Sequence, residues 1–330
     1  MMTNDPVTHP DARRRFRTIG CRKGGSSARA NRVSRVTDRA FSVRTTDDRV
    51  VEVLTAGPTD GTPLIFNTGS PGGAALFPLL TEAAAEHHLR VVHYSRPGFG
   101  RSTAQPGRSV ADAAGDVAAI LDSLWADRFV TMGWSGGGPH ALASAALLSD
   151  RCAAAASVSG SGPYGAAGLD WFAGMDDCNR EAYSLAAAGD IAGLTALNEA
   201  EAPRYPTMRA QPLDHTWAGH PARADVAAFR EFAAATCRNA LVEGIAGWRD
   251  DELALTRPWG FEVEQIRCPV TIWHGEADQM VPVGHGRWLT NHISGARAHF
   301  EPGLNHGALM RTHFRGIVAE LATLAARSTC

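Results

Sequence analysis

Short apolar runs of strand length recur along the chain and alternate with longer segments of helical composition. The runs that we predict as strands lie at 39–44, 50–55, 63–68, 89–94, 129–132, 154–159, 270–273 and 296–300. The predicted helices lie at 74–88, 110–124, 285–292 and 308–327, with a further one after residue 136. Because strands separated by such helices form parallel βαβ units, the pattern predicts an α/β fold with a mostly parallel central sheet flanked by helices.

The alternation stops between residues 160 and 267. This segment has no clear strand pattern and consists of alanine-rich helical pieces interrupted by prolines, with tryptophans and phenylalanines among them. We interpret it as a helical cap inserted over the carboxyl ends of the strands. The predicted organisation is an α/β core formed by residues 39–160 and 265–330, with the cap at 161–264 between its two parts.

Residues 1–38 differ in composition from the rest of the chain. They contain many more arginines than acidic residues and few large apolar side chains, which predicts a disordered basic tail. The arginines at 13–15 resemble the start of a twin-arginine export signal, but no apolar segment follows them. We therefore expect a solvated tail and a cytoplasmic protein.

Composition narrows the classes of function further. The formal net charge is −2 and no apolar run is long enough to span a bilayer, so we expect neither a nucleic acid nor a membrane as partner. The six cysteines are scattered without a CxxC pair, as in a reducing compartment. Lys23 is the only lysine, which excludes P-loop, Schiff-base and Ser–Lys chemistry in the folded body. A small molecule is the expected substrate, and the oligomeric state stays open.

The strongest local signal is the segment Gly133-Trp134-Ser135-Gly136-Gly137, which lies between a predicted strand and a predicted helix. Glycines two residues before and after a serine give room for the sharp turn of a nucleophile elbow, in which the serine hydroxyl stands clear of the sheet. The five-residue pattern alone also fits a glycine-rich turn with a bystander serine. Its interpretation therefore depends on partners for Ser135.

Two loops late in the chain supply such partners. Asp278 follows the predicted strand 270–273, and His306 follows the strand 296–300. The carboxyl ends of parallel strands meet at one edge of a sheet, so these loops are expected beside Ser135. A serine hydroxyl needs a histidine to remove its proton and a carboxylate to orient that histidine. We predict His306 as the base and Asp278 as the acid, in preference to Glu276, which lies too close to its strand.

Attack by a serine creates an oxyanion, which requires backbone N–H donors. One predicted donor is Gly136, directly after the nucleophile at a helix N-terminus. The other is Ser70, in the glycine- and proline-rich loop after the strand 63–68. Taken alone, that loop is better explained as a simple glycine- and proline-rich turn.

These motifs together resemble the α/β-hydrolase superfamily over roughly residues 40–160 and 265–327. The matching segments, in chain order, are TGSPGG (68–73), RPGFGRS (96–102), GWSGGGPHALA (133–143), HGEADQMVP (274–282) and PGLNHG (302–307). The resemblance implies a serine hydrolase with a helical cap that needs no metal and no organic cofactor. The chain departs from the family pattern at Thr68, where a histidine is usual, and at Ser95, where an aspartate is frequent.

The predicted activity is cleavage of an ester through an acyl-enzyme, with amide cleavage similar to that of proline iminopeptidases, C–C bond hydrolysis and cofactor-free perhydrolysis as alternatives. A serine at the elbow speaks against the dehalogenase and epoxide hydrolase branches, which use aspartate there. A non-enzymatic ligand receptor on the same fold is the alternative of another class. Trp134, Trp171, Phe172 and Met280 are candidates for lining an apolar substrate pocket, although large apolar side chains more commonly belong to a core.

Overall fold

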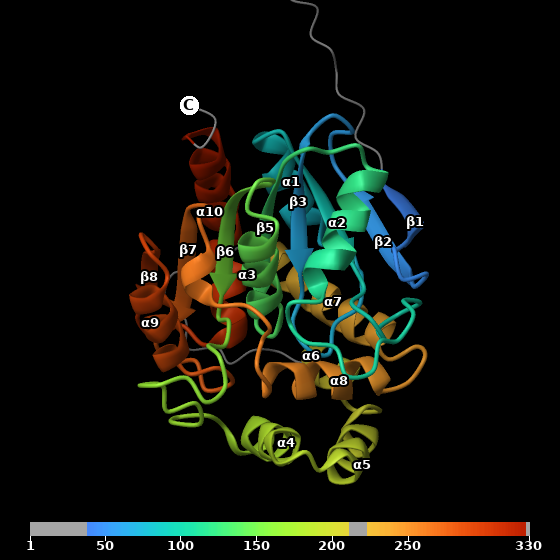
Figure 1. Cartoon of the computed structure of the whole chain (residues 1–330), viewed down its shortest axis with the longest axis vertical. Helices are drawn as coiled ribbons and strands as arrows, with labels where there is room; N and C mark the ends of the chain where they lie inside the picture. Colours follow the sequence, from blue (N-terminus) through green and yellow to red (C-terminus); the bar gives the residue numbers. More distant parts are fainter. Residues whose placement is uncertain (1–37, 211–222, 328–330) are drawn as a thin grey trace, which may run out of the picture. The chain divides into compact units, whose positions relative to one another are not determined.

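The computed structural model describes residues 38–210 and 223–327. The predicted tail lies outside the described residues except for position 38, and so do residues 211–222 of the predicted cap. In the described part, eight strands form one sheet in the order β1-β2-β4-β3-β5-β6-β7-β8 (Figure 1). The strands are β1 (Arg39–Arg44), β2 (Val50–Ala56), β3 (Thr62–Asn67), β4 (Leu89–Tyr94), β5 (Phe129–Trp134), β6 (Cys152–Val158), β7 (Val270–Gly275) and β8 (Arg297–Glu301).

The pairing directions confirm the predicted fold class. β1 and β2 form an antiparallel hairpin, and β2 also pairs antiparallel with β4. Every other neighbouring pair in the sheet is parallel. The carboxyl ends of β3 to β8 therefore share one edge of the sheet, where Ser135, Asp278 and His306 follow their strands.

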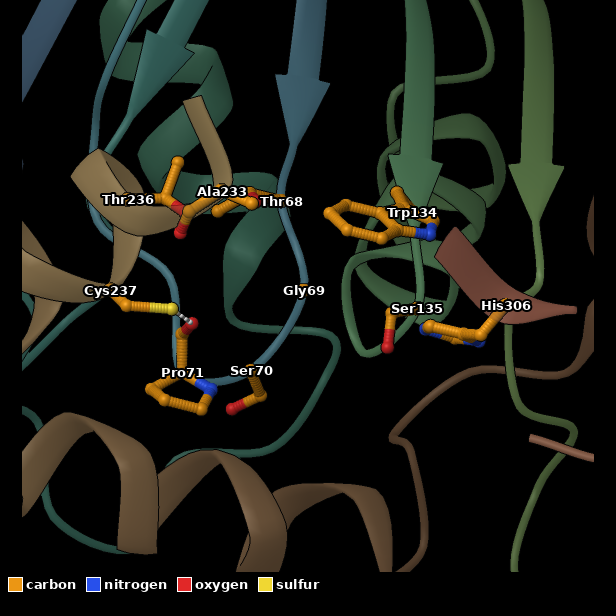
Figure 2. A pocket seen from close by; sticks show the side chains of 10 residues that line it. All are labelled: Thr68, Gly69, Ser70, Pro71, Trp134, Ser135, Ala233, Thr236, Cys237 and His306. Carbon is orange, nitrogen blue, oxygen red and sulfur yellow. Dashed lines mark hydrogen bonds between the residues drawn. The ribbon is translucent and has the colours of Figure 1, made fainter. Parts of the chain in front are cut away.

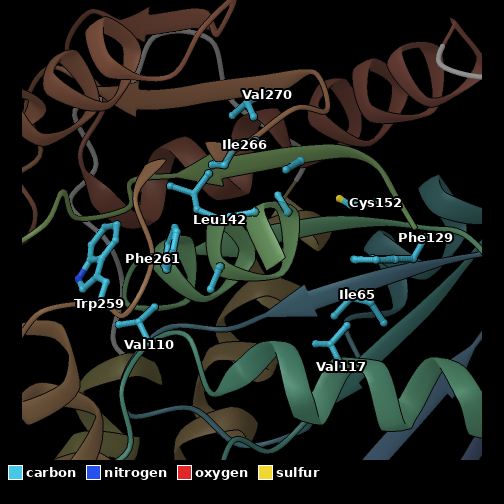
Figure 3. Packing of buried hydrophobic residues seen from close by; sticks show 14 of the residues in the cluster. Ile65, Val110, Val117, Phe129, Leu142, Cys152, Trp259, Phe261, Ile266 and Val270 are labelled. Atoms are coloured by element: carbon cyan, nitrogen blue, oxygen red, sulfur yellow. The ribbon is translucent and has the colours of Figure 1, made fainter. Parts of the chain in front are cut away.

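Helices cover both faces of this sheet. α2 (Ala113–Ser123), α3 (Gly137–Leu147) and α9 (Val283–His292) pack on one face, where apolar side chains of strands and helices form a buried cluster (Figure 3). α1 (Pro78–Glu86) and α10 (His306–Arg327) pack on the other face. The central strand β6 contributes mainly buried alanines, so α3 and α10 can both pack closely against it.

Two predicted helices are shorter in the structure: 110–124 is helical only as α2, and 74–88 only as α1. The segment 74–88 was expected to be helical throughout, but α1 begins at Pro78. A proline is favoured at the first helical position, where its missing N–H is not needed. The residues before it form a loop whose polar groups have other partners: the Ala74 N–H donates to Oγ of Ser95 (2.8 Å), and the Gly73 N–H donates to the Thr236 carbonyl (2.9 Å).

The described part of the insertion between β6 and β7 is helical and contains no strand, as its pattern predicts. Its helices are α4 (Asp177–Ala188), α5 (Ile191–Glu201), α6 (Tyr205–Ala210), α7 (Arg223–Ala240) and α8 (Ala246–Leu255), followed by the short 3₁₀ helix η1 (Val263–Gln265). The arrowheads of β3 and β6 in Figure 1 point toward α6 and α8, with α4 and α5 beyond them. One member, α7, also packs with α1 and α10 through Phe229 and Phe232, so it contributes to the core.

Candidate active site

Ser135 occupies a strained turn between β5 and α3. Its φ is +58°, a left-handed conformation that is uncommon for a residue other than glycine. The turn requires close packing of backbone on both sides, because a Cβ on Gly137 would overlap the carbonyl of Asn67. The Ser135 N–H donates to the Val158 carbonyl at 2.9 Å, which fixes the turn against β6. This is the geometry expected of a nucleophile elbow.

Asp278 lies in the loop after β7 and is 4% exposed. Its Oδ1 accepts hydrogen bonds from the N–H groups of Met280 (3.0 Å) and Val281 (2.9 Å), and its Oδ2 accepts one from Nδ1 of His306 (2.7 Å). Burial by itself raises the pKa of this carboxyl, but the charge and hydrogen bond of His306 outweigh it and hold the pKa below its usual value. Asp278 is thus ionised at neutral pH and selects the tautomer of His306 with a proton on Nδ1.

His306 is the first residue of α10 and does not lie in the preceding loop, where it was predicted. The helix begins two residues earlier than expected because the Asn305 side chain accepts a hydrogen bond from the Ala308 N–H at 3.0 Å. The imidazole stacks on Trp134, with the ring centroids 5.6 Å apart. Nε2 of His306 is buried and has no hydrogen-bond partner among residues 38–210 and 223–327. Its lone pair is therefore available to a neighbouring hydroxyl.

Glu276, the alternative acid, and the nearby His274 do not form part of the arrangement of Asp278 and His306. Glu276 is on the surface, where its carboxylate pairs with Arg287 at 2.9 Å. His274 is buried under the Asp278 loop, and its Nε2 donates to the Val281 carbonyl at 2.7 Å. Burial lowers the pKa of His274, so this ring is neutral and supports the loop that carries Asp278.

Ser135 and His306 line one small pocket together with the loop after β3 (Figure 2). Its volume of about 10 Å³ matches roughly one water-sized sphere. The two predicted N–H donors lie next to each other here, because a Cβ on Gly136 would be 3.5 Å from the Ser70 nitrogen and 3.2 Å from its Cβ. Gly69 leaves room for the nucleophile, since a Cβ there would lie only 3.0 Å from the Ser135 Cβ. The structure thus brings together all five residues predicted for the triad and the oxyanion hole.

The family model of the alpha/beta hydrolase fold matches residues 62–310. The chain belongs to this family. The matched range runs from β3 into α10 and includes the elbow, both late loops and the whole helical insertion.

The proteins to which this α/β-hydrolase is similar are named for different activities. It is 37% identical to the putative carbamate hydrolase RutD of Variovorax paradoxus (strain S110), over 25% of this chain and 32% of that protein. It is 27% identical to a non-heme chloroperoxidase of Streptomyces lividans, over 82% of this chain and 94% of that protein. Among solved structures, the esterase RhEst1 of Rhodococcus sp. ECU1013 superimposes with a TM-score of 0.60 at 21% identity, covering 87% of this chain and 98% of that one.

A larger cavity of about 450 Å³ adjoins the small pocket, and Trp134, Ala233 and His306 line both. Met280 lies in its wall, as predicted. The sequence did not single out Phe229 and Tyr205, which line the same cavity from α7 and α6. Aromatic side chains in alanine-rich helices carry no pattern that separates a pocket wall from a core position.

Trp171 and Phe172 do not line either cavity beside Ser135. Trp171 is 4% exposed, its Nε1 donates to the Gly162 carbonyl at 2.8 Å, and its ring meets His285 edge-on. Phe172 contacts Trp171 edge-on, with ring centroids 5.2 Å apart. These two aromatics pack the segment between β6 and α4, so their predicted role in lining a substrate pocket finds no support in this geometry.

The structure shows which contacts are made at the two positions that depart from the family pattern. Ser95 takes part in a network in which its Oγ donates to Glu52 (2.7 Å) and accepts from the Ala74 N–H (2.8 Å). Thr68 offers its backbone carbonyl to Nη1 of the buried Arg96 at 2.7 Å. The support of the loop after β3 therefore comes from Arg96, a residue that the sequence presented only as part of a turn motif.

Neither a metal site nor a membrane-spanning helix is found among residues 38–210 and 223–327. In that part of the chain, no group of three or more His, Cys, Asp or Glu side chains is placed to hold a metal ion. The same part contains no helix with the length and apolarity needed to cross a membrane.

Proposed function

We propose that this protein is a serine hydrolase that cleaves an ester of a small or medium apolar acid through an acyl-enzyme. One observation carries the proposal: Nδ1 of His306 is bound to a buried ionised Asp278, while Nε2 is left without a partner in the described part of the chain, in the pocket that Ser135 lines. An imidazole held this way is equipped to take a proton from a hydroxyl.

In the proposed reaction, His306 removes the hydroxyl proton of Ser135 as its Oγ attacks the ester carbonyl. The oxyanion of the tetrahedral intermediate accepts hydrogen bonds from the N–H groups of Ser70 and Gly136. His306 then donates the proton to the leaving alcohol, and the C–O bond breaks to give the acyl-enzyme. A water molecule, deprotonated by His306, attacks this ester and releases the acid with regeneration of the Ser135 hydroxyl. Asp278 keeps the imidazole oriented and stabilises its charged form.

The larger cavity supports the choice of substrate class. Trp134, Tyr205, Phe229 and Met280 give it an aromatic and apolar wall next to His306. Its volume of about 450 Å³ is within the range of small-molecule sites, and such walls favour an apolar acyl or aryl group.

The test is a set of p-nitrophenyl esters of graded acyl length together with a fluorophosphonate probe. Wild type should hydrolyse short to medium esters and be labelled, and the control Ser123→Ala, which removes an exposed hydroxyl on α2, should behave like wild type. Ser135→Ala should neither hydrolyse the esters nor be labelled by the probe. Labelling without turnover of any ester, lactone or aminoacyl amide would instead favour a ligand receptor on this fold.

Perhydrolysis is the second candidate, and the similarity to the Streptomyces lividans chloroperoxidase over 94% of that protein favours it. Here hydrogen peroxide replaces water in attacking the acyl-enzyme, so that a peracid leaves. Acetate, peroxide and bromide should then brominate monochlorodimedone, and the reaction should disappear in Ser135→Ala. Ester hydrolysis without halogenation would exclude this candidate.

A further inference from the structure

A buried guanidinium lies directly behind the loop that supplies the Ser70 N–H. Arg96 follows β4 and is 1% exposed. Its Nη1 donates to the Thr68 carbonyl at 2.7 Å, and its Nη2 donates to the Gly69 carbonyl at 3.1 Å. Two donors of one rigid, planar group thus hold two consecutive peptides of this loop.

The second of these bonds involves the oxyanion donor itself. The Gly69 carbonyl and the Ser70 N–H belong to the same peptide unit, and in a planar trans peptide the two groups point in opposite directions. When Arg96 holds the carbonyl on one side, the N–H is aimed to the other side, where Gly136 and Ser135 lie. A charged donor on the carbonyl also polarises the peptide and strengthens its N–H as a donor.

Arg96 is in turn held by a carboxylate from the insertion. Asp251 of α8 is fully buried and contacts Arg96 through both oxygens, with Nε of Arg96 3.2 Å from Oδ1. The same Oδ1 accepts a hydrogen bond from Nη2 of Arg108 at 2.6 Å. Burial raises the pKa of Asp251, but the two guanidinium groups outweigh burial and hold it well below the usual range. The carboxylate is therefore ionised.

His140 completes the cluster on the side of the second oxyanion donor. Its Nδ1 donates to the Gly136 carbonyl at 2.8 Å, and its Nε2 lies 3.8 Å from Asp251. Burial and the repulsion of Arg96 lower the pKa of His140 to about 3, so the ring is neutral. Arg96 thus places a positive charge next to the Gly69 carbonyl, of the sign that favours an oxyanion on the other side of that peptide.

The geometry points to Arg96 as a positioning residue that orients the Ser70 N–H for the oxyanion, with Asp251 of α8 holding Arg96 in place. The inference rests on the proposed function. It also assigns the helical insertion a part in catalysis: α8 acts on the oxyanion hole through the guanidinium, in addition to covering the site.

The experiment compares two variants with two matched controls. Arg96→Lys keeps the positive charge but loses the two-carbonyl fork, and Asp251→Asn removes the charge that orients Arg96. Arg49→Lys is the control for the first, since Arg49 also pairs with a buried carboxylate, Asp116, at 2.7 Å. Asp250→Asn is the control for the second, because Asp250 is the buried neighbour on the same helix and pairs with Arg249.

For each variant, kcat and KM are measured on the best ester, together with the affinity for an alkyl boronic acid, which forms a tetrahedral adduct with the serine and places an oxygen in the oxyanion hole. Removal of one oxyanion donor lowers kcat by about 10²–10³-fold, so a donor that is only wrongly oriented should lower kcat by roughly 10–10²-fold. We expect that loss in Arg96→Lys and Asp251→Asn, a parallel loss of boronate affinity, and KM within about threefold. In the two control variants, kcat, KM and boronate affinity should each stay within about threefold of wild type.

A lower melting temperature with unchanged kcat and boronate affinity would mean that the cluster is only structural, and would overturn the inference. If one variant does not fold, the other decides, because each breaks the same chain of contacts at a different residue. Arg108→Lys, which loosens Asp251 without touching the loop, should give an intermediate loss. A wild type that neither hydrolyses esters nor reacts with the probe would refute the proposed function, whereas an active wild type with Arg96→Lys equal to Arg49→Lys would refute this inference alone.

Discussion

Glu252 gives this protein a built-in dependence of stability on pH. Its side chain is buried between α8 and the neighbouring helices, and its Oε2 accepts a hydrogen bond from Nδ2 of Asn198 on α5 at 2.7 Å. Burial raises the pKa of Glu252 from 4.5 to about 8, although hydrogen bonds from Asn198 and Trp248 oppose the shift. The charge of the adjacent Asp251 acts in the same direction as burial.

The sign and size of the effect follow from this shift. Between pH 4.5 and about 8 the carboxyl is ionised in the unfolded chain and protonated in the folded one, so folding takes up a proton. The stabilising contribution is complete below pH 4.5 and is lost as the pH rises through about 8. At about 1.4 kcal/mol for each pKa unit, the loss has an upper bound of roughly 5 kcal/mol.

Glu252→Gln tests this reasoning, because the amide is neutral at every pH and keeps an oxygen for Asn198. Urea unfolding followed by circular dichroism at pH 4.5, 6, 7.5 and 9 should show equal stability of wild type and variant at the lowest value. The variant should be more stable by about 2–4 kcal/mol at the highest, within the bound above. Glu276→Gln, on the surface, is the control and should show no such divergence. A difference between Glu252→Gln and wild type that does not change with pH would refute the raised pKa.

The remaining predictions concern the site. Ser135→Ala should abolish ester turnover and fluorophosphonate labelling without lowering the melting temperature by more than about 2 °C, because it removes one oxygen atom at a partly exposed position. Asp278→Asn should lower kcat by up to about 10⁴-fold through loss of the correct tautomer, whereas Glu276→Gln should leave it within about twofold. Phe229→Ala should raise kcat/KM for long acyl esters relative to short ones because it enlarges the cavity, whereas Phe172→Ala should lower thermal stability and leave the ranking of esters unchanged.

Each of these has a contrary outcome. Persistent labelling of Ser135→Ala would place the nucleophile elsewhere, and a larger loss in Glu276→Gln than in Asp278→Asn would reverse the choice of acid. If Phe172→Ala changed the ranking of the esters and Phe229→Ala did not, the expectation from the sequence that Phe172 lines the substrate pocket would hold.

The sheet and the residues proposed for the triad were accessible from the sequence because their signals are local. A β-branched or alanine-rich run marks each central strand, and glycines mark the turn at Ser135. The parallel direction of β3 to β8, and the edge that carries Asp278 and His306, follow from this pattern and from the chain direction. The sequence-based prediction was wrong where hydrogen bonds from residues far away in the chain override a local preference for a helix. Residues 74–77 have helical composition, yet the Ala74 N–H donates to Ser95 and the Ala74 carbonyl accepts from Asn239.

The hydrogen bonds by which Arg96 supports the loop after β3 could not be predicted from the sequence in the same way. Arg96 and Asp251 are 155 residues apart in the chain. The sequence explains each segment by other means, Arg96 as part of a turn motif and Asp251 as part of the helical insertion. A carboxylate and a guanidinium become partners only once α8 has been placed against the loop after β4. The same holds for the cavity wall, since Phe229 and Trp134 meet only in the folded chain.

The position of His306 at the start of α10 has a consequence for the newly made chain. Synthesis proceeds from the amino end at about 5–20 residues per second, so in the proposed mechanism the nucleophile leaves the ribosome on the order of ten to thirty seconds before its base. During that interval the fold lacks both α10 and the imidazole, and the serine is an ordinary unreactive alcohol. In the proposed mechanism, activity begins only when α10 has joined the fold, so a nascent chain that has not yet reached His306 cannot act on esters.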